Sequence, residues 1–172
     1  MREAIFDVLM HHPTHGCDLS GDARVLDLFA GAGGLGIEAL SRGGAGAEAQ
    51  FVERDRGAVQ VLRRNLKDLG LGERTTVWPL DAGRAVERLA DAGARFDLVL
   101  MDPPYALTDA EATVRILKSL AAADLLAHGG VVVLERAVTS NDDAPWVAGL
   151  GEPLVRRWGD TEALFYRNDS EP

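Results

Sequence analysis

The sequence predicts a single α/β domain, residues 1–172, with a mostly parallel, Rossmann-like sheet and helices on both faces. Short apolar runs alternate along the chain with segments that have a helical period. A glycine-rich turn follows the first of these runs. The last two strand-like segments flank Gly159 and Asp160, which predicts a C-terminal antiparallel hairpin. We therefore expect seven strands, of which only the last two form a hairpin.

The elements follow from apolar spacing and from residues that break or cap helices. Expected strands are 24–30, 49–53, 75–80, 96–101, 131–135, 154–158 and 163–167. Expected helices are 4–10, the segment from the glycine turn to about 41, 56–69 with Asp55 as its N-cap, 83–91 and 109–126. The two prolines after residue 102 end the fourth strand, because proline has no N–H to donate.

Composition limits the classes of protein that fit. No apolar run approaches the roughly 20 residues that a bilayer requires, and the N-terminus lacks the zones of a signal peptide. A cytoplasmic location with no membrane contact is expected. The formal charge of −9 opposes nucleic-acid binding, for which a basic surface is typical. The basic run at residues 54–67 is better interpreted as a solvated helix face than as a binding surface.

The glycine-rich turn indicates a ligand that contains adenosine. Gly31, Gly33 and Gly36 match G-x-G-x-x-G between a strand and a helix. Glu53 ends the second strand, where a carboxylate can accept hydrogen bonds from ribose hydroxyls. NAD and S-adenosylmethionine both fit this pattern. The alternative is that the glycines only allow the strand and helix to pack closely.

Asp27 favours S-adenosylmethionine, because a carboxylate within a buried strand is costly unless a donor pairs with it. The ammonium of a methionine moiety and the amides of the glycine turn are such donors. Alternatively, Asp27 only tethers the turn. Asp81 and the backbone amide of Ala82 follow the third strand and are candidates for contact with adenine, although Asp81 is equally well placed to cap a helix. Phe29 and Arg54 complete the set of candidate cofactor-binding residues.

The segment Asp102-Pro103-Pro104-Tyr105 is the most specific feature, since it ends the fourth strand where open α/β sheets bind ligands. Asp102 and the carbonyl of Pro103 can accept the two hydrogens of an exocyclic base amine. The prolines restrict the conformations of these acceptors. Tyr105 offers a flat face on which an extruded base can stack. The alternative is an acidic turn closed by two prolines.

A histidine group near the N-terminus does not indicate a metal site. His11, His12 and His15 are interrupted by Pro13, and no carboxylate follows at ligand spacing. We expect a polar loop there and no bound metal.

With these residues in place, the chain resembles the RsmD family of bacterial 16S rRNA guanine-N2 methyltransferases. The segments that carry the resemblance are REAIF at 2–6, VLDLFAGAGGLGIEALSR at 25–42, FVERD at 51–55, NL at 65–66, DPPY at 102–105 and ALFY at 163–166. The EALSR helix is more typical of this family than the glycine turn itself. Members usually carry a basic β-hairpin and an Arg-Pro-Thr stretch before the first of these segments, and we expect that hairpin to be absent here.

The resemblance implies a class I methyltransferase fold with S-adenosylmethionine as the cofactor. It also implies catalytic roles for residues 102–105, and 16S rRNA within the small ribosomal subunit or its assembly intermediate as the substrate. We expect a monomer, although the sequence itself does not determine the oligomeric state. Three alternatives remain open at this stage. They are an adenine-N6 methyltransferase of DNA or RNA, an NAD-dependent oxidoreductase, and a fold that binds the cofactor without activity.

Overall fold

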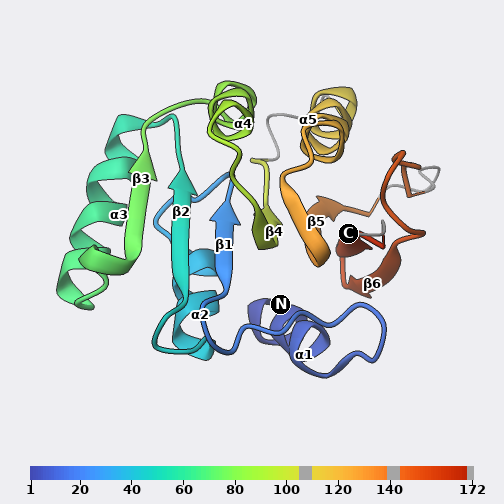
Figure 1. The fold of residues 1–172 in the computed structure, drawn as a ribbon, viewed down its shortest axis with the longest axis horizontal. Coiled ribbons are helices and arrows are strands. Elements are labelled where there is room, and N and C mark those ends of the chain that lie inside the picture. Colours follow the sequence, from blue (N-terminus) through green and yellow to red (C-terminus); the bar gives the residue numbers. More distant parts are fainter. Residues whose placement is uncertain (105–109, 139–143, 170–172) are drawn as a thin grey trace.

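Seven strands form one mixed sheet in the order β3-β2-β1-β4-β5-β7-β6 (Figure 1). The computed structural model describes residues 1–104, 110–138 and 144–169. The strands are β1 (Arg24–Asp27), β2 (Glu48–Val52), β3 (Thr75–Trp78), β4 (Phe96–Met101), β5 (Leu126–Ala137), β6 (Leu154–Trp158) and β7 (Thr161–Arg167). The first five are parallel, and β7 runs antiparallel to both β5 and β6. The predicted α/β class, the seven strands and the terminal hairpin are confirmed.

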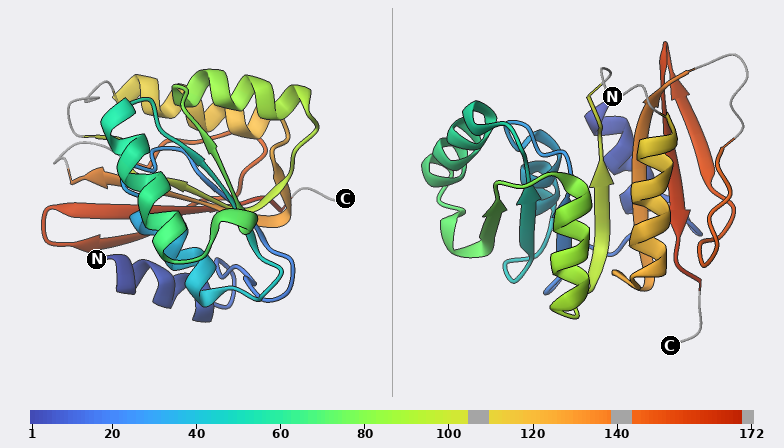
Figure 2. Two further views of the ribbon diagram at one scale, coloured as in Figure 1. Left: turned by 90° about the vertical axis from the view of Figure 1, so that its left-hand side faces the viewer. Right: turned by 90° about the horizontal axis from the view of Figure 1, so that it is seen from above.

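Helices cover both faces of the sheet (Figure 2). They are α1 (Arg2–His11), α2 (Gly34–Arg42), α3 (Arg56–Asp68), α4 (Ala82–Asp91) and α5 (Ala110–Ala122), with a short 3-10 turn, η1 (Gly72–Arg74), before β3. Side chains of α1, α2 and α3 pack into one apolar core, and those of α4 and α5 pack into a second. Alternate residues of the central strands point into the two cores. For example, Leu100 lies in the first core and Val99 in the second.

The order of the strands determines where a ligand can bind. β1 lies between β2 and β4, so the chain moves outward in one direction from β1 to β3 and then returns to the other side with β4. The crossover helices leave opposite faces at this point, which opens a crevice outside the carboxyl ends of the strands. Asp27 ends β1 and lies beside Leu100 of β4 and Phe51 of β2. The residues that follow these three strands therefore meet around one crevice.

The boundary between α5 and β5 differs from the sequence prediction. The expected helix 109–126 ends at Ala122, and the strand expected at 131–135 begins at Leu126. Asp124 has a φ of 52°, a left-handed conformation that an α-helix cannot contain. Leu125 and Leu126 are buried after this turn, so these two apolar residues pack at the start of β5 and do not continue the apolar face of α5. The spacing of apolar residues alone did not distinguish a longer helix from an earlier strand.

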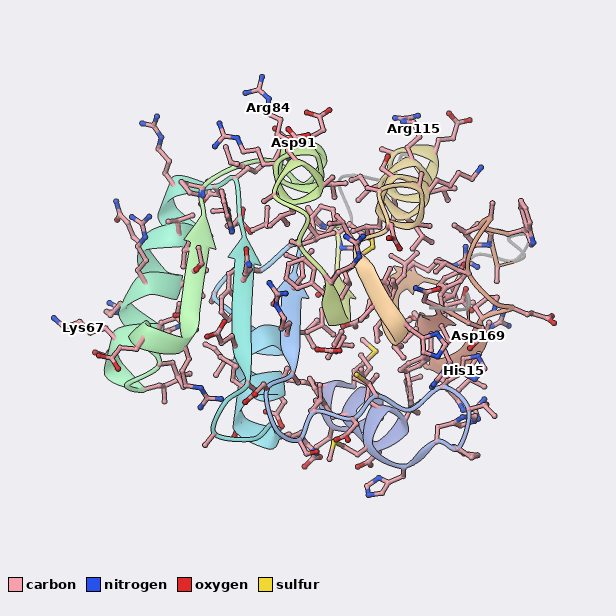
Figure 3. All side chains as sticks on the ribbon, viewed as in Figure 1. His15, Lys67, Arg84, Asp91, Arg115 and Asp169 are labelled. Carbon is pink, nitrogen blue, oxygen red and sulfur yellow. The ribbon has the colours of Figure 1, made fainter. Side chains whose placement is uncertain are left out.

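Charged side chains project outward from the helices (Figure 3). Lys67 of α3, Arg84 and Asp91 of α4, and Arg115 of α5 point away from the sheet. The basic residues of α3, namely Arg56, Arg63, Arg64 and Lys67, are all exposed, as expected for a solvated face. Among the helices in the described ranges, none is both long and apolar enough to cross a bilayer.

We predict that Gly36→Ala destabilises the fold, because the new Cβ would clash with the buried ring of Phe51, lying 2.9 Å from its Cζ and 3.1 Å from Asp27 Oδ2. Overpacking of this kind costs about 1–3 kcal/mol, which exceeds the gain in helix propensity of about 1 kcal/mol. The free energy of unfolding should fall by on the order of 1 kcal/mol in urea titrations. Gly34→Ala in the same helix is the control, since its Cβ would meet nothing closer than 3.8 Å. Equal stability of the two variants would contradict the prediction.

Candidate active site

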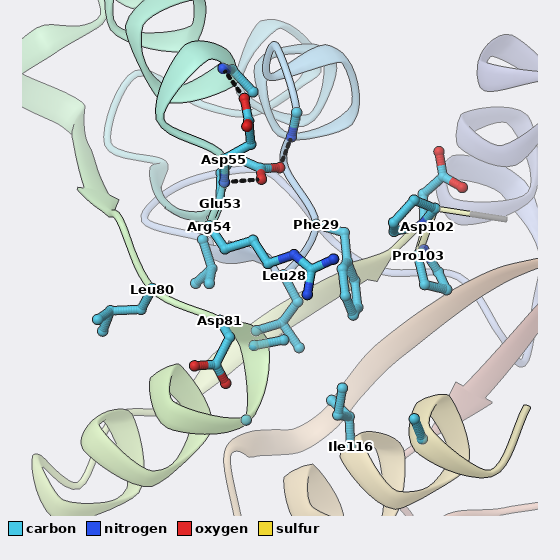
Figure 4. Close-up of a pocket in the computed structure, with 17 residues that line it drawn as sticks. Leu28, Phe29, Glu53, Arg54, Asp55, Leu80, Asp81, Asp102, Pro103 and Ile116 are labelled. Atoms are coloured by element: carbon cyan, nitrogen blue, oxygen red, sulfur yellow. Dashed lines mark hydrogen bonds between the residues drawn. The ribbon is translucent and has the colours of Figure 1, made fainter. Parts of the chain in front are cut away.

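A pocket of about 650 Å³ opens at the carboxyl ends of β1, β2 and β4 (Figure 4). Its apolar wall includes Leu28, Val52, Leu80 and Ile116. Its polar residues include Glu53, Arg54, Asp81 and Asp102. A pocket of this size and mixed lining is typical of a site for a small organic cofactor.

Glu53 is held rigidly at the edge of this pocket. Its Oε2 accepts a hydrogen bond from the backbone N–H of Gly31 at 2.9 Å, and its Oε1 accepts one from the N–H of Asp55 at 2.7 Å. Asp55 in turn caps α3 by accepting from the N–H of Ala58. The carboxylate of Glu53 therefore joins the end of β2 to the glycine turn, and Glu53 also lines the pocket.

Asp81 has two roles in the geometry. It caps α4 by accepting a hydrogen bond from the N–H of Arg84 at 3.1 Å, as one of the two sequence interpretations expected. It also lines the pocket together with Ala82, which is the position that contact with adenine would require. Figure 4 shows the side chain of Arg54 extending across the pocket toward Phe29.

The glycine turn is built around the buried carboxylate of Asp27, which is 1% exposed. Asp27 Oδ2 accepts a hydrogen bond from the N–H of Gly36 at 2.9 Å. Gly33, with a φ of 93°, supplies the left-handed residue that begins α2. Asp27 Oδ1 makes no hydrogen bond with any described residue. Asp27 thus tethers the turn and keeps one buried oxygen available for a donor.

This environment disfavours the charged form of Asp27. Burial raises the pKa of its carboxyl to about 7, and the negative charges of Asp102 and Glu53 contribute to the increase. The backbone N–H groups of Gly36 and Phe29 act in the opposite direction, because they stabilise the carboxylate. A donor or cation that meets Oδ1 would lower this pKa again.

A second cavity, of about 250 Å³, lies beside the first. It is lined by Arg2, Asp27, Phe29, Ala30, Gly34, Leu35, Asp102 and Glu135. Phe29 and Asp102 line both cavities, so these two side chains lie where the cavities adjoin. An elongated ligand in the larger cavity would direct one end toward Asp27 and Asp102.

The segment after β4 stands at this junction. Asp102, Pro103 and Pro104 all line the larger cavity, and partial withdrawal from water raises the pKa of Asp102. Tyr105, the fourth residue of the predicted motif, lies outside the described residues. Of the candidate cofactor-binding residues, Phe29, Gly31, Glu53, Arg54, Asp81 and Ala82 line the larger cavity and Asp27 lines the smaller one. Gly33 lines neither, and its contribution is to the shape of the turn.

Two residues of the smaller cavity were not identified from the sequence. Arg2 of α1 reaches the glycine turn and donates from Nη1 to the carbonyl oxygen of Gly34 at 3.3 Å. Glu135 of β5 is buried beside Asp102, with 7% of its surface exposed. The sequence did contain a signal for Glu135, because it ends the expected strand 131–135 at the same sheet edge as Asp27 and Glu53.

Comparisons with known proteins agree with this geometry. Residues 1–167 match the family described as "Conserved hypothetical protein 95". "Putative rRNA methyltransferase YlbH" of Bacillus subtilis is 40% identical over 112 residues, which cover 65% of this chain and 58% of that protein. "Ribosomal RNA small subunit methyltransferase D" of Escherichia coli is 40% identical over 97 residues, 56% of this chain and 46% of that protein. The matched segment thus spans about half the length of these curated relatives.

A solved structure extends the match to nearly the whole chain. The "Putative methyltransferase yhhF from Escherichia coli" superposes with a TM-score of 0.76 at 30% identity, over 99% of this chain and 86% of that one. The fold is therefore that of class I methyltransferases, and the family resemblance seen in the sequence is confirmed.

We predict that Asp27→Asn changes how stability depends on pH. The folded protein keeps a proton on Asp27 up to about pH 7, whereas an unfolded chain releases it near pH 4. Stability contributed by the protonated form is complete below about pH 4 and is lost as pH rises toward 7. Relative to Asp27→Asn, the wild-type free energy of unfolding should therefore fall by more than about 1 kcal/mol between these pH values. Urea titrations at several pH values measure this difference, and a constant difference would contradict the buried proton.

Proposed function

The chain belongs to the RsmD family, matched here as conserved hypothetical protein 95, and we propose that it methylates the N2 amine of a guanine in 16S rRNA. One observation carries the proposal. Asp102 and the two prolines after β4 line the larger cavity, and Asp102 also lines the smaller one next to the unpaired oxygen of Asp27. A methyl donor in the larger cavity and a base amine at the junction of the two cavities would meet at Asp102.

The residues of the two cavities fit S-adenosylmethionine as the cofactor. Asp27 Oδ1 is buried without a donor, and the ammonium of a methionine moiety would supply one. Glu53 can accept hydrogen bonds from ribose hydroxyls. The apolar side chains of Leu28, Val52 and Leu80 suit the faces of an adenine ring. We propose Phe29, Arg54, Asp81 and Ala82 as further contacts of the adenosine part.

The chemistry requires a positioned acceptor, because the lone pair of an exocyclic amine is delocalised into the base. When bound, S-adenosylmethionine supplies an electrophilic methyl group on its sulfonium. Asp102 and the carbonyl oxygen of Pro103 accept the two amine hydrogens, which directs the nitrogen lone pair along the line of transfer. The raised pKa of Asp102 also suits it to take the proton that the nitrogen releases. Tyr105 is proposed to stack on the extruded base.

The substrate class rests on the relatives. Both curated relatives are named as rRNA methyltransferases, and one of them is named for the small subunit. We propose the same substrate for this protein, namely 16S rRNA in the small ribosomal subunit or its assembly intermediate.

The direct test is transfer of labelled methyl from S-adenosylmethionine to small subunits from cells that lack this enzyme. We expect label in 16S rRNA, at N2 of one guanine after nuclease digestion and chromatography. Free adenine-containing DNA and RNA serve as parallel substrates. Label at adenine N6 would replace the proposal with the adenine alternative, and absence of label from all substrates would refute it.

Cofactor identity is tested separately by calorimetric titration. We expect S-adenosylhomocysteine to bind and NAD not to bind, because Asp27 offers an acceptor for an ammonium that NAD does not have. The opposite result would make the protein an NAD-binding member of this fold.

We predict that Asp102→Ala lowers kcat by about 10²-fold or more, a loss typical of removing one positioned polar group from the reacting centre. Binding of S-adenosylhomocysteine should stay within a few-fold, because the cofactor pocket keeps Glu53 and the glycine turn. Asp91→Ala, on the outer surface of α4, is the matched control and should keep full activity (Figure 3). Equal loss of binding and activity in Asp102→Ala would place Asp102 in cofactor binding instead.

A further inference from the structure

Glu135 is a buried carboxylate that the proposed methyl transfer does not yet use. It follows Leu134 of β5, whose register partner is Met101, the last residue of β4, so Glu135 and Asp102 each directly follow one member of this pair. Both side chains line the smaller cavity. Glu135 is 7% exposed and accepts no hydrogen bond from the described part of the chain.

The other buried glutamate of the sheet shows the usual arrangement. Glu162 of β7 is 1% exposed, and its two oxygens accept hydrogen bonds from Arg136 and Arg157, each at 2.7 Å. Among the residues that the structure describes, Glu135 has no such partner. Arg2 lines the same cavity, but its guanidinium donates to the Gly34 carbonyl and not to Glu135. Since the fully buried unpaired oxygen of the described residues belongs to Asp27, the Glu135 carboxylate opens on the cavity that it lines, where a ligand can supply a donor.

We propose that Glu135 is a specificity-determining residue that accepts the N1–H of the target guanine while Asp102 holds the N2 amine. The inference rests on the proposed function and extends it to the choice of base. The Watson–Crick edge of guanine places N1–H and N2–H₂ side by side, which matches two carboxylates that directly follow paired residues of neighbouring strands.

The same pair of carboxylates disfavours adenine. Beside its exocyclic amine, adenine presents N1 as an acceptor, and an ionised carboxylate has only acceptors. The two would face each other in a cavity from which water is partly excluded, and Glu135 would stay unpaired. A site built to pair with a hydrogen of its substrate rejects analogues that lack it, because its own polar group is then left unsatisfied.

The ionisation of Glu135 sets the condition for the test. The pKa of Glu135 is raised to about 7, mainly by burial and also by the charges of Asp102 and Asp27, whereas the terminal ammonium of Met1 acts in the opposite direction. Arg2 is the other charged group that lines this cavity. At pH 8 the carboxylate is ionised, so assays at this pH measure it as an acceptor.

The experiment compares guanine with 2-aminopurine at the methylated nucleotide, in small subunits reconstituted with synthetic rRNA segments. 2-Aminopurine keeps the amine at C2, but its N1 has no hydrogen. The wild-type enzyme should prefer guanine by at least about 30-fold in kcat/KM. In Glu135→Gln the amide can accept from guanine N1–H or donate to N1 of 2-aminopurine, so the preference should shrink to within about 3-fold.

Two further variants separate base choice from stability. Glu162→Gln removes an acceptor from the other buried glutamate and should lower the midpoint of thermal unfolding without changing the base preference. Glu135→Asp keeps a carboxylate, so it should keep the preference for guanine at a lower rate. The Kd for S-adenosylhomocysteine should stay within roughly 3-fold of the wild-type value in both Glu135 variants.

Each result is decisive. A wild-type enzyme that methylates both bases equally overturns the inference without any variant. An unchanged preference in Glu135→Gln also overturns it, and weaker S-adenosylhomocysteine binding with that unchanged preference would make Glu135 a cofactor contact. If wild type methylates no guanine but binds S-adenosylhomocysteine, the proposed function fails, and the inference fails with it.

Discussion

The buried carboxylate of Asp27 is the constraint on which the rest of the site depends. Its Oδ2 accepts the N–H of Gly36, and any side chain at residue 36 would press on that oxygen and on Phe51. This contact fixes the start of α2 against the end of β1. The turn in turn presents the N–H of Gly31 to Glu53, so β2 is joined to the same framework. These two hydrogen bonds therefore link two strands and a helix around the crevice.

The electrostatic character of the crevice follows from where the strands end. Asp27 ends β1, Glu53 and Asp102 directly follow β2 and β4, and Glu135 lies near the carboxyl end of β5, so all four carboxylates lie at one edge of the sheet. Burial and mutual repulsion raise the pKa of Asp27 and of Glu135 to about 7. A ligand that brings positive charge or hydrogen-bond donors relieves this repulsion, and part of its affinity would come from that relief. The site therefore favours a cationic cofactor over an anionic dinucleotide.

Much of the fold could be predicted from the sequence, because apolar periodicity and capping residues are local signals. Asp55 as the cap of α3 and the hairpin around Gly159 are examples. The end of α5 could not be predicted, since the apolar residues Leu125 and Leu126 suit a helix or a strand, and the backbone of Asp124 decides between them. Glu135 was missed for a different reason. Glu135 is of interest because none of the described residues donates a hydrogen bond to it. Only the three-dimensional packing of the neighbouring strands shows this.

The acidic crevice bears on the proposed function, because an acidic protein would have to act on RNA. Phosphate groups would be repelled by the carboxylates around Asp102, so the RNA backbone has to stay outside the crevice. A base is uncharged, and the Watson–Crick edge of guanine presents two adjacent donors that carboxylates attract. In the proposed reaction, the charge of the crevice would therefore admit a base only after that base has left its stack and turned away from its own backbone. In that reaction, contacts to phosphate would have to come from basic side chains outside the crevice. The proposed function therefore requires that the base and the RNA backbone be recognised by separate surfaces of opposite charge.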